Sequence, residues 1–65
     1  MRIEVNGKPQ DIQARTLAEA LAELGLTDAV LATAVNGCFV SSTERDEIPL
    51  QYGDRVEIVM PMQGG

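Results

Sequence analysis

Residues 16–25, TLAEALAELG, form the clearest helical pattern of the chain. Thr16 and Glu19 are spaced as a capping box, in which each side chain bonds a free backbone N–H of the first helical turn. One apolar stripe follows at helical spacing: Leu17, Ala20, Leu21 and Leu24. Gly25 stands where a residue with positive φ ends many helices. We therefore expect a short amphipathic helix with one buried face.

A β-hairpin is predicted before this helix. Residues 1–6 alternate apolar and polar, which is typical of a strand with one buried face. Asn6-Gly7 is the pair that suits a tight hairpin turn, because both positions tolerate positive φ. Residues 8–13 form the returning strand, and Pro9 places it at a sheet edge.

A second hairpin and a last strand are predicted after the helix. A strand over residues 30–35 leads through Asn36-Gly37 to a returning strand over 38–41. We expect a solvated loop over residues 41–47, followed by a turn over 48–50 that packs against the core. A second turn at Gly53-Asp54 then leads to the last strand, over residues 55–60.

These elements predict an α+β fold with a mixed sheet of about five strands. One helix covers one sheet face, and parallel pairing of the first and last strands gives a β-grasp arrangement. The predicted packing places Leu17, Leu21 and Leu24 on Ile3, Val5, Val56 and Ile58. The opposite face keeps Arg2, Glu4, Glu57 and an apolar Val59. We expect one domain over residues 1–61 and a flexible tail over 62–65.

The amino-acid composition alone argues against several classes of function. The chain has 65 residues, a net charge of −5, no His and one Cys. These counts argue against a His-based catalytic site, a multi-Cys zinc site and a disulfide framework. The acidic balance argues against nucleic-acid partners, and no apolar run approaches a membrane span. We expect a monomeric cytoplasmic protein that binds no cofactor or metal and is not an enzyme.

The chain end offers the main candidate for chemistry. Residues 61–65, PMQGG, follow the last strand directly. Four extended residues reach about 13 Å, which is enough to enter the active site of another protein. Gly64 and Gly65 lack Cβ atoms and so suit a narrow channel. The α-carboxylate of Gly65 resists nucleophiles and needs activation, most simply as an acyl-adenylate.

Several motifs together resemble the ThiS family, the small ubiquitin-like sulfur carriers of thiamin biosynthesis. The matching residues span nearly the whole chain: Ala34-Val35-Asn36-Gly37, Phe39-Val40, Leu50-Gln51, Gly53-Asp54-Arg55 with Glu57, and Pro61-Met62-Gln63-Gly64-Gly65. The ending is the most specific of them.

The resemblance implies a mechanism and a set of partners. A ThiF-like adenylyltransferase of the ubiquitin-activating type would use ATP to adenylate Gly65, and sulfur from a cysteine desulfurase would give a thiocarboxylate. A ThiG-like thiazole synthase would accept that sulfur. Gly64, Gln63 and Met62 would be the residues by which these enzymes recognise the tail.

Other residues offer weaker candidates. Cys38 is an alternative sulfur site as a persulfide, although no cation close in sequence lowers the pKa of its thiol. The carboxylates of Glu44, Asp46 and Glu47 suggest a metal loop, but their spacing is more typical of a solvated loop. Val59 and Met60 flank the tail and belong either to the core or to an exposed docking patch.

Two other functions stay open at this point. One is a sulfur carrier for molybdopterin or another pathway. The other is a ubiquitin-like modifier or binding module, which forms an isopeptide bond or only docks.

Overall fold

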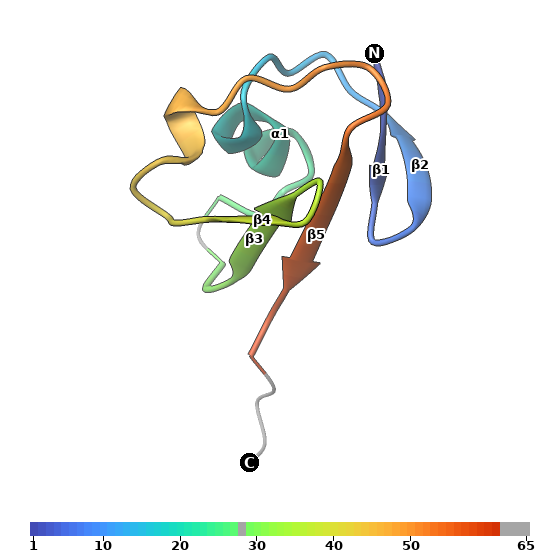
Figure 1. The fold of residues 1–65 in the computed structure, drawn as a ribbon. Helices are drawn as coiled ribbons and strands as arrows, with labels where there is room; N and C mark the ends of the chain where they lie inside the picture. The colour runs from blue at the N-terminus through green and yellow to red at the C-terminus, as the bar shows by residue number, and fades with distance from the viewer. Residues whose placement is uncertain (28, 62–65) are drawn as a thin grey trace.

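The computed structural model describes residues 1–27 and 29–61. The chain order is β1 (Arg2–Val5), β2 (Lys8–Asp11), α1 (Leu17–Glu23), β3 (Ala32–Val35), β4 (Cys38–Val40), a 3₁₀ helix (Arg45–Glu47) and β5 (Arg55–Val59). The sheet order is β2-β1-β5-β3-β4, and α1 lies on one side of it (Figure 1). β5 runs parallel to β1 and antiparallel to β3. The mixed five-stranded β-grasp sheet is confirmed; the expected tail over residues 62–65 lies outside the described residues.

The predicted capping box begins α1. The backbone N–H of Glu19 donates to the Thr16 hydroxyl at 3.2 Å, and the Glu19 carboxylate accepts from the N–H groups of Arg15 and Thr16. These two backbone hydrogen bonds, that from Arg15 first, lower the pKa of Glu19 below its usual value. Gly25 has φ +81° directly after the C-cap, as the sequence predicts.

Both predicted Asn-Gly turns are present. Asn6 and Asn36 each adopt φ 51°, and a glycine with positive φ follows each of them. The first turn joins β1 to β2, which lies at the sheet edge as Pro9 predicts. The second joins β3 to β4.

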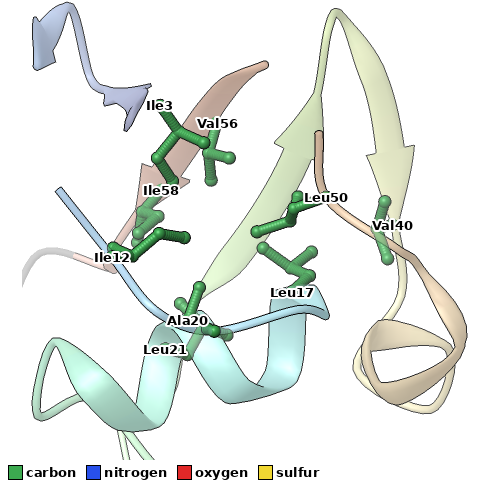
Figure 2. Packing of buried hydrophobic residues seen from close by; sticks show 10 residues of the cluster. Ile3, Ile12, Leu17, Ala20, Leu21, Val40, Leu50, Val56 and Ile58 are labelled. Atoms are coloured by element: carbon green, nitrogen blue, oxygen red, sulfur yellow. The ribbon is translucent and has the colours of Figure 1, made fainter. Parts of the chain in front are cut away.

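The core lies between α1 and the covered face of the sheet. Figure 2 shows Leu17 and Leu21 of α1 facing Ile3, Val56 and Ile58 of the sheet, with Leu50 and Val40 closing one side. Leu17 is fully buried, which confirms the predicted stripe, whereas Leu24 and Val5 are only partly buried at its margin. Such burial is the main favourable term in folding a small domain.

The structure corrects two predictions, besides ending β2, β4 and β5 one or two residues before the predicted ends. β3 begins at Ala32 and not at Val30, whose side chain is 79% exposed. The segment over residues 41–47 is not only a solvated loop, because Arg45 is half-buried. Its guanidinium donates to the Thr33 hydroxyl at 3.0 Å and to the Leu31 carbonyl at 2.7 Å. A polar side chain thus ties this segment to β3, which a count of charged residues does not reveal.

Candidate functional site

β5 is the strand that precedes the predicted tail in sequence. This strand occupies the centre of the sheet and leads through Met60 to Pro61, at the lower end of the molecule in Figure 1. The predicted tail residues Met62, Gln63, Gly64 and Gly65 follow directly and lie outside the described residues. The structure therefore shows the chain as far as Pro61, the residue that precedes the predicted reactive tail.

An apolar patch covers part of the open sheet face. Val59 of β5 is 64% exposed, and Ala32 of β3 stands directly opposite it. In the neighbouring row, Ala34 pairs with Phe39 of β4, whose side chain is 71% exposed. Residues paired directly across strands share a face, so these four side chains form the apolar patch: Ala32, Ala34, Phe39 and Val59.

The apolar surface continues to the point where β5 ends. Met60 is exposed, and together with Pro61, Ala29 and Val30 it lines a shallow hollow beside the end of the strand. Exposed apolar surface of this kind often marks an interaction site. Of the two possibilities for Val59 and Met60, core or exposed surface, the structure places both on the surface.

Phe39 is the largest side chain of this surface that was not predicted as a site residue. The signal was available, since Val40 is buried and neighbouring residues of a strand point to opposite faces.

The other half of the open face is charged. Arg2 of β1 pairs with Asp11 of β2, and Glu4 of β1 pairs with Arg55 of β5. Glu57 of β5 shares this face and pairs with Ala34 of β3. Arg2 and Asp11 form an exposed ion pair at 3.6 Å, a type that contributes little to stability. The apolar patch thus lies on the β5-β3-β4 side of the open face, and Glu57 borders it opposite Ala34.

The two alternative sites lie elsewhere. Cys38 opens β4 and is exposed, but it points to the sheet side opposite Phe39, since strand side chains alternate. Glu44, Asp46 and Glu47 are exposed around the 3₁₀ helix, where the Glu44 carboxylate accepts from the Ser41 hydroxyl at 2.9 Å. Within residues 1–27 and 29–61, no three His, Cys, Asp or Glu side chains gather in a way that would hold a metal ion.

Among the described residues, no helix has the length and apolarity needed to cross a membrane.

Comparison with known proteins links the chain to one family. The sequence profile of the ThiS family matches residues 3–65. A sulfur carrier protein ThiS from Thermus thermophilus is 38% identical over 61 residues, which cover 94% of this chain and 95% of the relative.

Solved structures agree with this match. The crystal structure of a thiamine biosynthesis protein (ThiS) from Geobacter metallireducens is 30% identical, with a TM-score of 0.81 and full coverage of both chains. A solution NMR structure of a thiamine biosynthesis protein from the same organism has 28% identity and a TM-score of 0.79 over all of this chain and 88% of the other.

Proposed function

The chain belongs to the ThiS family of sulfur carriers in thiamin biosynthesis, and on that premise we propose that Gly65 carries the sulfur as a C-terminal thiocarboxylate. The observation that carries this proposal is that the family match extends through the last residue, so that the Gly64-Gly65 ending lies within it. β5 lies at the centre of the sheet and ends at Val59, and Met60, Pro61, Met62 and Gln63 connect it to this ending.

The proposed chemistry begins with activation of the chain end. The Gly65 carboxylate attacks the α-phosphorus of ATP in a ThiF-like adenylyltransferase, which gives an acyl-adenylate and releases pyrophosphate. A persulfide supplied by a cysteine desulfurase then attacks the acyl carbon and AMP leaves. A thiol cleaves the resulting acyl disulfide, itself becoming part of a disulfide, and the thiocarboxylate remains on Gly65.

The proposed role of the folded domain is docking. The apolar patch borders the strand that carries the tail, so an enzyme that receives Gly65 would contact this patch at the same time. The proposed docking surface consists of the apolar patch, which includes Val59, and the neighbouring Met60. Met62, Gln63 and Gly64 form the segment that would enter the partner's channel. Burial of such exposed apolar groups would contribute to binding.

The proposal assigns the remaining chemistry to partners. ATP binds to the adenylyltransferase and not to this chain, and a ThiG-like thiazole synthase takes the sulfur into the thiazole ring. The chain acts as a protein co-substrate, a monomer when free, and Cys38 takes no part in the transfer.

A tail deletion tests the proposal. Removing Gly64 and Gly65 should abolish complementation of a thiamin auxotroph that lacks its own carrier, while the circular dichroism spectrum and the thermal midpoint stay unchanged. A matched variant with one Ala added after Gly65 keeps both glycines but displaces the carboxylate, and it should also fail. Growth supported by either variant without added thiamin would contradict the proposal.

A further inference from the structure

The side chain of Asn6 holds β5 close to the start of the tail. Its Oδ1 accepts from the Ile58 N–H at 2.8 Å, and its Nδ2 donates to the Ile58 carbonyl at 3.0 Å. The paired residues of β1 end with Val5 opposite Val56, because the chain turns away at Asn6-Gly7 toward β2. The side-chain amide of Asn6 therefore makes the two hydrogen bonds to Ile58 that the backbone of a longer β1 would otherwise make.

Asn36 offers an internal comparison. It occupies the same position of an equivalent Asn-Gly turn, with the same φ of 51°. Its Oδ1 also bonds β5, but at the first residue of the strand, where it accepts from the Arg55 N–H at 3.0 Å, and its Nδ2 donates to Asp54 at 3.1 Å. Two similar side chains thus secure opposite ends of one strand, and only Asn6 acts at the end that leads to the tail.

We infer that Asn6 is a positioning residue that fixes the end of β5, the strand that precedes the tail in sequence. This inference rests on the proposed function of Gly65. With Ile58 held by Asn6 on the β1 side and Val59 paired with Ala32 on the β3 side, Met60 and Pro61 leave the sheet from a fixed point. A fixed departure point reduces the conformational freedom that must be lost when a partner binds the tail.

The test compares Asn6→Gly with Asn36→Gly. Each variant leaves a glycine pair that suits the turn, so the backbone conformation is retained while one side chain is removed. Amide hydrogen exchange should become faster at Ile58 in the first variant and at Arg55 in the second. Asn6→Asp keeps an acceptor for the Ile58 N–H but has no donor for the carbonyl.

Kinetics of adenylation give the functional readout, with the carrier as the varied substrate of a ThiF-like adenylyltransferase from the same cell. Asn6→Gly should raise KM roughly three- to tenfold with little change in kcat, Asn6→Asp should lie between it and the wild type, and Asn36→Gly should keep the wild-type KM. Equal KM changes in both glycine variants, or a wild-type KM in Asn6→Gly, would overturn the inference. Absence of adenylation in the wild-type chain would instead contradict the proposed function.

Discussion

The two faces of the sheet use the same strands for different purposes. Along β5, Ile58 is 8% exposed on the face that α1 covers, whereas the next residue, Val59, is 64% exposed on the open face. Both are aliphatic, so hydrophobicity alone does not separate them. The face to which each side chain points decides whether burial occurs during folding or remains available for a partner.

The two faces of this small sheet are therefore expected to differ in role, one in folding stability and the other in partner binding. The covered face holds nearly all of the aliphatic core against one short helix. The open face carries the apolar patch beside the strand that leads to the tail. We therefore expect substitutions on the covered face to change the free energy of unfolding, and those on the open face to change partner binding.

The largest effect is expected from Leu17→Ala. Leu17 is fully buried between α1 and the sheet, so truncation should lower the free energy of unfolding by about 2–5 kcal/mol. The matched open-face variant Val59→Ala should change it by less than about 0.5 kcal/mol. Urea denaturation measures both, and similar losses in the two variants would remove the distinction between the faces.

Phe39→Ser should produce the largest effect on binding. Loss of an exposed aromatic group from the apolar patch should weaken binding to a ThiF-like adenylyltransferase by about 10- to 100-fold, with the fold unchanged. Tyr52→Ser is the control, because Tyr52 is equally exposed but lies in the turn at the opposite end of β5. Calorimetric titration in which both variants bind alike would argue against docking through the patch.

Thr16→Ala tests the helix that covers the buried face. Loss of the N-cap hydroxyl should lower the free energy of unfolding by about 1 kcal/mol, since the Glu19 N–H loses its acceptor. Binding of the folded protein to partners should not change. Ser42→Ala, at an exposed loop position, provides the baseline in the same denaturation experiment, and equal values for the two would show that the cap contributes nothing measurable.

The smallest effect is expected from pH acting on Glu19. Because the pKa of Glu19 is lowered in the folded state, its carboxylate contributes stability above its unfolded pKa, and this contribution is lost as pH falls through the folded value. The stability difference between the wild type and Glu19→Gln should therefore shrink toward zero in acid. Denaturation midpoints measured across the acidic range check this, and a pH-independent difference would contradict it.

Local signals explain why much of the fold was predictable. The capping box, the two Asn-Gly turns and the alternation in β5 each depend on residues close in sequence, and the structure confirms all of them. The contact of Arg45 with Thr33 was not predicted, because it joins side chains twelve positions apart through a buried hydroxyl. The same holds for Asn6 and Ile58, whose bond spans nearly the whole chain.

The candidate site was predictable only in part. The Gly64-Gly65 ending is visible in the sequence because the chemistry proposed for it uses only the carboxylate at the chain end. The apolar patch depends on cross-strand register, which places Phe39 beside Ala34 and Val59 beside Ala32. Such pairs are fixed by the three-dimensional arrangement of β3, β4 and β5, so the sequence alone indicated only Val59 and Met60.

Intact-mass spectrometry can show whether Gly65 carries the sulfur. The purified chain is incubated with ATP, a ThiF-like adenylyltransferase, a cysteine desulfurase, cysteine and a thiol, and fragmentation then locates any added mass. We expect exchange of one oxygen for sulfur at Gly65, to the same extent in Cys38→Ser. Sulfur found on Cys38, or Gly65 joined to a lysine of another protein with no thiocarboxylate formed, would contradict it.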